Sequence, residues 1–239
     1  MKKNMNDINV VMMVYNRPQY FRQVLDSLIN QTVDFNLHVI SNNPKHNNLF
    51  LSVIDKYKRH FNINFYEADN SRMTFERWYY INEHLSDNQY IILLDDDIIL
   101  NNDSIEKIWE TKEKNTYKVF QGRQFLKSQP IITKDVWNQF TNDYTEFSYG
   151  ATNFAIIDIN LLYDIFNYEA MYPELCYKAD DLVISWAVTR NNGKILNHKV
   201  YPANDQLGVD AEAMFIMLEK LDIYKEYQKL DNIHKFNRF

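Results

Sequence analysis

The stretch YIILLDDDIIL, at residues 90–100, decides how the rest of the chain is interpreted. Five apolar or aromatic residues lead into three consecutive aspartates, and three apolar residues follow them. The first part is typical of a strand that is buried on both faces of a sheet. Carboxylates are rarely buried without a partner. Three aspartates at the end of a core strand therefore indicate a site for a cation or a ligand.

Alternation along a strand predicts how these aspartates are arranged. Side chains two residues apart share a face, so Asp95 and Asp97 are predicted to point together and Asp96 to point away. Neighbouring carboxylates repel unless a cation or a proton lies between them. Mg²⁺ and Mn²⁺ suit such oxygens and take their remaining ligands from water and phosphate. A plainer alternative is that the aspartates cap a helix that begins near Asn101 or Asp103.

The composition sets limits on the class of protein. The chain has 239 residues, a hydrophobic fraction of 46% and a net charge of -6. It is long enough for one large domain or two small ones, and its charge disfavours nucleic acid as a partner. The single cysteine, Cys176, excludes an intrachain disulfide and a cysteine-based zinc site. Neither a GxGxxG nor a GxxxxGK[ST] loop is present.

Apolar runs and helical stripes alternate through the first hundred residues. We predict strands at 8–16, 35–43, 63–70 and 90–95, and helices at 18–31, 49–61 and 73–85. This alternation implies a mostly parallel sheet that is covered by helices on both faces, an α/β fold.

The pattern loosens in the second half. We predict short strands at 119–126 and 129–134, a longer one at 151–159, a helix from Asp180 or Asp181 to Gly193, and an amphipathic helix at about 210–227. No linker or internal repeat interrupts the chain. We therefore expect one domain, 1–239, with a nucleotide-binding half at about 1–100 and an acceptor-binding half at about 101–239.

Three motifs carry a resemblance to a known family. YNRP at 15–18, DDD at 95–97 and ADDLVISWA at 179–187 follow each other as in GT-A glycosyltransferases. From about Asn9 to His198 the chain resembles the family-2-like enzymes and the exostosin-like transferase domains. The resemblance implies a GT-A fold and a metal-dependent transfer of a sugar. The donor would be a nucleoside diphosphate sugar, by default a UDP-sugar, and the acceptor a hydroxyl of a glycan or glycolipid. The implied setting is surface polysaccharide biosynthesis.

The resemblance also implies roles for single residues. Asp95 would hold the ribose, Asp97 would bind Mn²⁺ or Mg²⁺, and His198 would be a further metal ligand. Asp181 would be the catalytic base with Asp180 beside it. The family-2-like enzymes invert and the exostosin-like enzymes retain, so we lean only slightly towards inversion. The residues implied in binding the nucleotide sugar are Val14, Tyr15, Arg17, Asn42, Arg77, Asp95, Asp96, Gly150 and Asn153.

Several expectations concern acceptors, partners and location. Trp137, Tyr149 and Tyr172 are candidates for stacking on an acceptor sugar. No apolar stretch approaches the length needed to cross a bilayer, so we expect a cytoplasmic protein. Its tail, residues 226–239, could rest on the inner face of the membrane or pair with another subunit in a homo-oligomer. Two alternatives to the transferase stay open. One is an inactive GT-A-like domain that binds carbohydrate or protein, and the other is a DxD phosphohydrolase.

Overall fold

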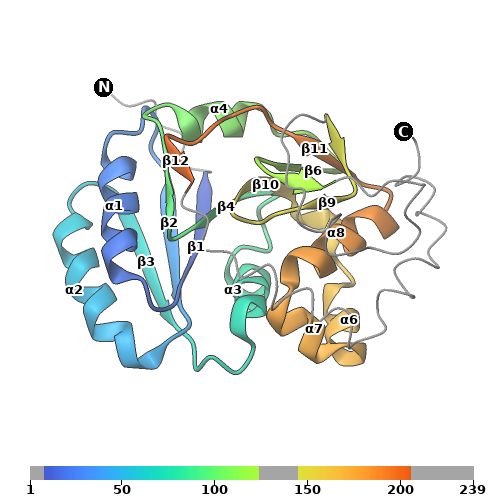
Figure 1. The fold of residues 1–239 in the computed structure, drawn as a ribbon, viewed down its shortest axis with the longest axis horizontal. Helices are drawn as coiled ribbons and strands as arrows, with labels where there is room; N and C mark the ends of the chain where they lie inside the picture. The colour runs from blue at the N-terminus through green and yellow to red at the C-terminus, as the bar shows by residue number, and fades with distance from the viewer. Residues whose placement is uncertain (1–7, 124–144, 206–239) are drawn as a thin grey trace.

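A sheet of eight strands forms the centre of the computed structural model, which describes residues 8–123 and 145–205. The strand order is β3-β2-β1-β4-β10-β6-β11-β8. In Figure 1, α1 and α2 lie on the left of the sheet and α6, α7 and α8 on the right. The predicted α/β architecture, a large and mostly parallel sheet flanked by helices, is confirmed.

The first half of the chain alternates regularly, as its apolar pattern predicted. Strands β1, β2, β3 and β4 pair in parallel, with β1 between β2 and β4. Short 3-10 helices precede α2 and α3. The elements are β1 (Asn9–Val14), α1 (Pro18–Ile29), β2 (Asn36–Ser41), η1 (Pro44–His46), α2 (Asn47–Tyr57), β3 (Asn62–Glu67), η2 (Met73–Phe75), α3 (Glu76–His84) and β4 (Tyr90–Asp95).

The second half is less regular and makes the sheet mixed. Strand β10 runs antiparallel to both of its neighbours, β4 and β6. The elements are β5 (Ile98–Ile99), α4 (Ser104–Glu110), β6 (Thr116–Val119), β7 (Gly122–Arg123), β8 (Glu146–Phe147), β9 (Tyr149–Gly150), β10 (Phe154–Asp158), η3 (Ile159–Leu162), α6 (Ile165–Met171), α7 (Pro173–Lys178), α8 (Asp180–Arg190), β11 (Lys194–Asn197) and β12 (Asn204–Asp205).

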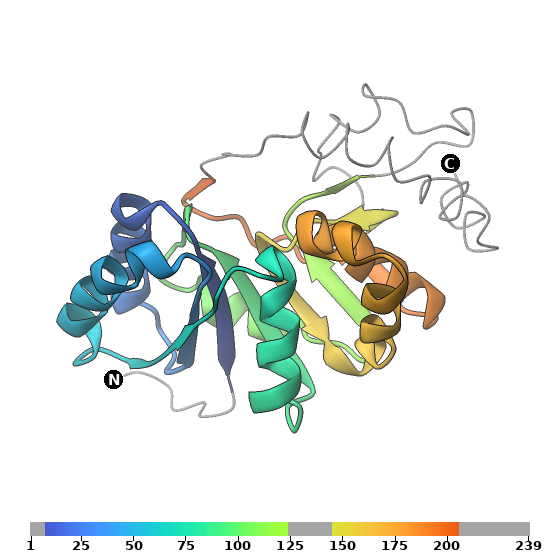
Figure 2. The same ribbon diagram turned by 90° about the horizontal axis from the view of Figure 1, so that it is seen from below.

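Each face of the sheet carries its own hydrophobic core. Successive strand residues point to opposite faces, so Val10 and Met12 pack with α1, α2 and α4. Val11 and Met13 pack instead with α3 and with α6 to α8. Figure 2 shows α1 and α2 separated from α3 by the first strands of the sheet. Burial on both faces explains why these strands read as unbroken apolar runs in the sequence.

Helix α1 shows how the local sequence builds this arrangement. Pro18 lies in its first turn, where the missing N–H is not needed. The helix buries Phe21, Val24, Leu25 and Leu28 on one side, each worth about 1.5–3 kcal/mol of transfer free energy. Its first turn is thereby held directly behind the end of β1, which places Arg17 at the edge of the sheet.

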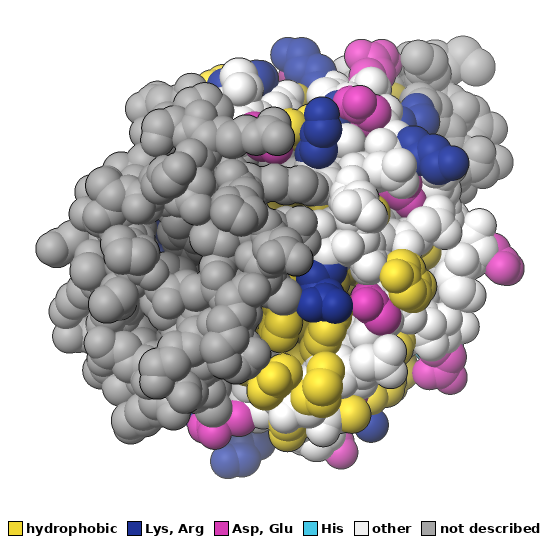
Figure 3. All heavy atoms as spheres, turned by 90° about the vertical axis from the view of Figure 1, so that its right-hand side faces the viewer, with side chains coloured by type: hydrophobic (Ala, Val, Ile, Leu, Met, Phe, Trp, Pro, Cys, Tyr) yellow, Lys and Arg dark blue, Asp and Glu magenta, His cyan; other side chains and the backbone are white. Residues whose placement is uncertain are grey.

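Some expectations fall outside the described residues. The strand expected at 129–134, the helix at about 210–227, Trp137 and the tail at 226–239 all lie there. Within residues 8–123 and 145–205, no helix is long and apolar enough to cross a bilayer. Figure 3 shows hydrophobic side chains gathered in the lower half of one face. Membrane contact and a homo-oligomer stay predictions.

Gly150 is a glycine because of packing around β9. A Cβ at this position would lie 2.6 Å from Val119 Cγ1 and 2.9 Å from Tyr117 Cε1. The space beside its Cα is therefore filled by the protein's own core, and contact of the Gly150 backbone with a donor sugar stays a prediction. Gly150→Ala should lower the free energy of unfolding by about 1–3 kcal/mol because it overpacks the core. Denaturant unfolding measures this; unchanged stability with weakened donor binding would contradict the packing explanation.

Candidate active site

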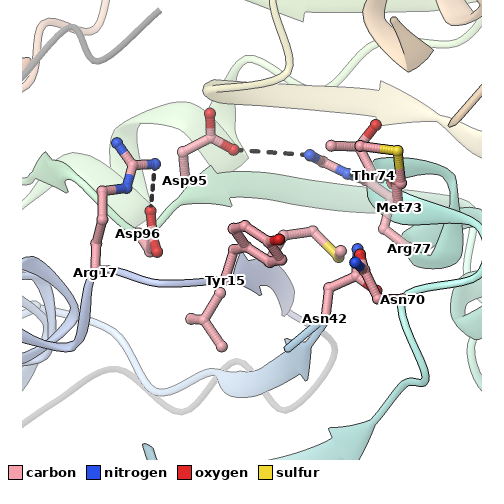
Figure 4. A pocket seen from close by; sticks show the side chains of 11 residues that line it. Tyr15, Arg17, Asn42, Asn70, Met73, Thr74, Arg77, Asp95 and Asp96 are labelled. Carbon is pink, nitrogen blue, oxygen red and sulfur yellow. Dashed lines mark hydrogen bonds and ion pairs between the residues drawn. The ribbon is translucent and has the colours of Figure 1, made fainter. Parts of the chain in front are cut away.

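The carboxyl ends of β1, β2 and β4 meet at one edge of the sheet and surround a pocket of about 220 Å³ (Figure 4). Open α/β sheets bind their ligands at this edge. The pocket is lined by Met13, Val14, Tyr15, Arg17, Asn42, Asn70, Met73, Thr74, Arg77, Asp95 and Asp96.

Arg17 holds two of the three consecutive aspartates. Its Nη2 lies 2.7 Å from Asp96 Oδ1, and its Nη1 pairs with Asp97. Strand β4 ends at Asp95, and Asp96 and Asp97 form a turn. Strand alternation therefore does not apply beyond Asp95. The prediction that Asp95 and Asp97 point together, with Asp96 away from them, is wrong. Asp96 and Asp97 instead converge on one guanidinium, so they are also not caps of α4.

Arg77 connects the aspartate run to the acidic pair on α8. It comes from the first turn of α3 and is 4% exposed. Its Nε lies 3.3 Å from Asp180 Oδ2 and its Nη2 lies 3.8 Å from Asp95 Oδ1. Trp78 Nε1 also donates to Asp180 Oδ2, at 3.1 Å. The Nη1 atom of Arg77 is buried without a hydrogen-bond partner, so one donor beside the pocket is unused by the protein.

Asp181 has different surroundings from Asp180, although both lie in the first turn of α8. Asp180 is 4% exposed, whereas Asp181 is partly exposed. Asp181 Oδ1 accepts from the Thr152 hydroxyl at 2.5 Å and from the Thr152 N–H at 3.3 Å. Asp181 Oδ2 accepts from the Tyr149 hydroxyl at 2.9 Å. The two neighbouring carboxylates are thus held by separate sets of donors.

Burial raises the pKa of the carboxylates in the site. Burial, together with the nearby charge of Asp180, raises the pKa of Asp181 to about 7. Burial also raises the pKa of Asp96 to about 7, while Arg17 opposes that shift. The pKa values of Asp95 and Asp97 are raised for the same first reason. The site therefore gains stability from a proton or from a bound cation.

The aspartates at 95–97 can supply only part of the coordination shell of a hard divalent ion. Among the described residues no group of three or more His, Cys, Asp or Glu could hold a metal alone. Asp96 Oδ2 is nevertheless buried without a hydrogen-bond partner, and carboxylate oxygens are the donors that Mg²⁺ and Mn²⁺ prefer. The chemistry of the donors fits an ion that is completed by water and phosphate oxygens.

His198 is not placed as a metal ligand in this conformation. Its Nε2 lies 3.1 Å from the Phe154 carbonyl oxygen, and its Nδ1 accepts from the Val200 N–H at 3.0 Å. Burial lowers its pKa to about 4, so the ring is neutral at pH 7. Both ring nitrogens are engaged by backbone groups, which leaves none directed to an ion.

Three further candidates have contacts within the protein. Asn153 donates to Gln121 Oε1 at 3.0 Å and accepts from the Phe154 N–H at 2.9 Å, so its amide is used within the protein. Tyr149 is 1% exposed and offers no face for stacking on a sugar. Tyr172 packs on Trp186 with 6.0 Å between ring centroids. The expected stacking of Tyr149 on a sugar is therefore wrong, whereas a sugar contact of Asn153, which is partly exposed, stays a prediction.

Other candidates line the pocket as expected. Tyr15 is 48% exposed there, and Asn42 Oδ1 is buried without a hydrogen-bond partner. Sequence analysis missed Met73 and Thr74 in the pocket and Thr152 beside Asp181. Met73 has φ 47°, which is unusual for such a side chain. No sequence pattern marks Met73, whereas Thr152 lies between Gly150 and Asn153, which were both named as candidates.

Asp181 should make stability depend on pH. The unfolded carboxyl has a pKa of about 4 and the folded one a pKa of about 7. Ionising Asp181 therefore lowers the free energy of unfolding as the pH rises through this range. Asp181→Asn should be more stable than the native protein by about 4 kcal/mol at pH 8 and nearly equally stable near pH 4. Denaturant unfolding at both pH values measures the gap.

The matched control for this prediction is Asp55→Asn. Asp55 has a side chain that is 66% exposed, and it pairs with Lys58. The difference in the free energy of unfolding between Asp55→Asn and the native protein should change little between pH 4 and pH 8. A gap for Asp181→Asn that is the same at pH 4 and pH 8 would contradict the raised pKa.

Comparisons with solved structures agree on the fold. S. aureus TarS is 17% identical with a TM-score of 0.59, and the match covers 97% of this chain and 41% of that chain. S. aureus TarS 1-349 in complex with UDP-GlcNAc is 16% identical with a TM-score of 0.59, and the match covers 97% of this chain and 69% of that chain. GalNAc-T7 with UDP, GalNAc and Mn²⁺ is 13% identical with a TM-score of 0.60, and the match covers 98% of this chain and 54% of that chain. This chain thus spans less than half the length of the first TarS chain.

The mannosyltransferase PcManGT from Pyrobaculum calidifontis, in complex with GDP-Man and Mn²⁺, is 12% identical with a TM-score of 0.53, and the match covers 96% of this chain and 72% of that chain. A comparison with curated proteins gave no significant match. The profile described as "Glycosyl transferase family 2" matches residues 9–193, which include the aspartate run and the acidic pair on α8. The chain therefore belongs to glycosyl transferase family 2 and has the GT-A fold.

Proposed function

We propose that the chain transfers a sugar from a UDP-sugar to a hydroxyl of a glycan or glycolipid acceptor, with Mn²⁺ or Mg²⁺ as its cofactor. The observation that carries this proposal is the buried bridge that Arg77 makes between Asp95 and Asp180. It brings the aspartate run at the end of β4 next to the partly exposed carboxylate of Asp181. A leaving group and an acceptor hydroxyl can then meet at one edge of the sheet.

The pocket supplies contacts that suit a nucleotide. The unpartnered Asn42 Oδ1 can accept from an N–H on the edge of a base such as uracil. The exposed ring of Tyr15 offers an apolar face to the base, and Asp95 can accept from ribose hydroxyls. Arg17, with 32% of its side chain exposed, presents a guanidinium that pairs well with diphosphate oxygens. Arg77 Nη1 is a second donor for an anionic ligand.

A divalent ion would be held by Asp97, with Asp95 and Asp96 adding negative charge around it. Mn²⁺ or Mg²⁺ bound there would neutralise charge on the departing diphosphate. His198 is left out of this set because both of its nitrogens have backbone partners. The protein itself contributes Arg77, whose charge lies in the site before any ligand arrives and so needs no rearrangement. Arg17 pairs with Asp97 in the structure, so it would turn from Asp97 towards the diphosphate when the ion binds.

Asp181 is the group best suited to act as the base. Its pKa of about 7 is near the value at which a carboxylate accepts protons effectively at neutral pH. The acceptor oxygen would attack the anomeric carbon, and the bond from that carbon to the diphosphate oxygen would break with its electron pair on the diphosphate. The acceptor proton would pass to Asp181, and the configuration would invert. Asp180 is enclosed by Arg77 and Trp78 and serves to hold Arg77.

Asp97→Ala should remove metal-dependent nucleotide binding. The native protein should show a higher melting temperature with Mn²⁺ and UDP together than with either alone, because a ligand that binds only the folded state stabilises it. Asp97→Ala should abolish this joint increase. Asp103→Ala is the control, because the Asp103 side chain is 44% exposed and pairs with Lys107. An undiminished increase in Asp97→Ala would refute the assignment of the metal.

Asp181→Asn should lower the rate of sugar transfer by about 10²–10⁴, the usual contribution of a general base. The assay is the release of UDP from a panel of UDP-sugars, with and without glycan acceptors. An NMR assignment of the anomeric configuration of the product would test inversion. UDP binding without turnover would favour the inactive binding domain. Phosphate release from simple monoesters would favour the phosphohydrolase.

A further inference from the structure

We infer that Tyr149 and Thr152 are positioning residues that hold the Asp181 carboxylate in the orientation in which it accepts a proton. This inference rests on the proposed role of Asp181 and adds two residues to it. Neither residue would touch the acceptor. Each would act through Asp181, because the hydroxyl groups of both residues donate to its oxygens.

Among residues 8–123 and 145–205, the hydrogen bonds to the Asp181 carboxylate leave one of its acceptor positions open. A carboxylate has about four lone-pair positions. Thr152 occupies two of them on Oδ1, and Tyr149 occupies one on Oδ2. Because Asp181 is partly exposed, the remaining position can face an acceptor hydroxyl. The three donors thus fix both the rotation of the carboxylate and the oxygen that reacts.

The backbone around these donors is also fixed to α8. The Gly150 N–H donates to Ser185 Oγ at 3.0 Å, and the Ser185 hydroxyl donates to the Asp181 carbonyl oxygen at 2.8 Å. Ser185 therefore joins β9 to the same helical turn that carries Asp181. The Tyr149 side chain is 1% exposed and Thr152 is 3% exposed. Neither can turn away without opening the core, so the orientation exists before a substrate binds.

The donors are neutral at every physiological pH. Burial, with the charge of Asp181 next, raises the pKa of Tyr149 well above its usual value, so Tyr149 keeps its proton. Arg123 lies over the Tyr149 ring with 5.6 Å to the centroid, which favours donation from the phenol towards a negative partner. The charged or titratable groups that act on Asp181 are Asp180, Arg77, Asp95, Tyr117 and Arg123.

These contacts oppose the effect of burial on the base. Burial and Asp180 favour the protonated form of Asp181, which cannot accept a proton. Hydrogen bonds donated to a carboxylate favour its charged form. Tyr149 and Thr152 would therefore keep more of Asp181 ionised at neutral pH than its location alone allows.

Tyr149→Phe tests the inference with a change of one oxygen atom. Loss of the Tyr149 hydroxyl should raise the pKa of Asp181 by about 1, since a hydrogen bond stabilises a charged group by at least the free energy that corresponds to one pKa unit. The acidic limb of the pH profile of kcat/KM should move upward. The rate should fall about tenfold at pH 6 and less than about twofold at pH 9, with the KM for the donor nearly unchanged.

Tyr168→Phe is the matched control. The Tyr168 hydroxyl also donates to a carboxylate at 2.9 Å, that of Asp164, and its side chain is 5% exposed. It lies in α6, outside the site. Tyr168→Phe should leave the acidic limb unchanged. Thr152→Val should shift the limb as Tyr149→Phe does, whereas Thr152→Ser should restore it because the hydroxyl returns.

A second measurement needs no substrate. In protein labelled with ¹³C at the aspartate side-chain carboxyls, NMR gives the pKa of Asp181 directly, and Asp181→Asn identifies its signal. An unchanged pKa and an unmoved limb in both Tyr149→Phe and Thr152→Val would overturn the inference. If Asp181→Asn itself left the transfer rate intact, the proposed base would fail instead. The two failures are therefore distinguishable.

Discussion

The buried guanidinium of Arg77 between Asp95 and Asp180 is the contact on which the rest of the site depends. It joins α3, β4 and α8, which come from both halves of the chain. Two carboxylates this close would repel each other in a buried position without it. Removing one partner of a buried ion pair typically costs about 3–5 kcal/mol, because it leaves an uncompensated charge. Arg77 therefore keeps together the pocket at the ends of the strands and the Asp181 carboxylate, which lie on different elements.

The sheet explains why these elements meet at this edge. The parallel strands β1, β2 and β4 end there, and the antiparallel strand β10 pairs with β4. The Asp95 N–H donates to the Asn153 carbonyl oxygen at 2.8 Å, so the segment just before β10 lies beside the end of β4. That segment also carries Thr152, which reaches Asp181. The change from parallel to antiparallel pairing thus brings the second half of the chain to the pocket at the ends of β1, β2 and β4.

Sequence reasoning found the strands of the first half because burial on both faces leaves continuous apolar runs. The end of one such run marked the aspartates at 95–97, whereas Val14, Tyr15 and Arg17 came from the resemblance to GT-A glycosyltransferases. Sequence reasoning failed where the role of a polar side chain depends on which groups it hydrogen-bonds. The amino-acid sequence does not show that backbone groups hydrogen-bond both ring nitrogens of His198, or that the Asn153 amide donates to Gln121. A run of identical aspartates likewise hides the point where the strand ends.

Asp180 and Asp181 show how a helix gives neighbouring identical residues different chemistry. Successive side chains on a helix point about 100° apart, so Asp180 faces Arg77 and Trp78 while Asp181 faces β9 and the segment after it. Asp180 pairs with the charged guanidinium of Arg77. Among the described residues, Asp181 accepts hydrogen bonds from neutral donors, and burial together with the charge of Asp180 raises its pKa to about 7. A carboxylate held by an arginine would be too weak a base, and one with no donors would stay protonated. Neutral donors on a partly exposed carboxylate give the intermediate proton affinity that a base needs at neutral pH.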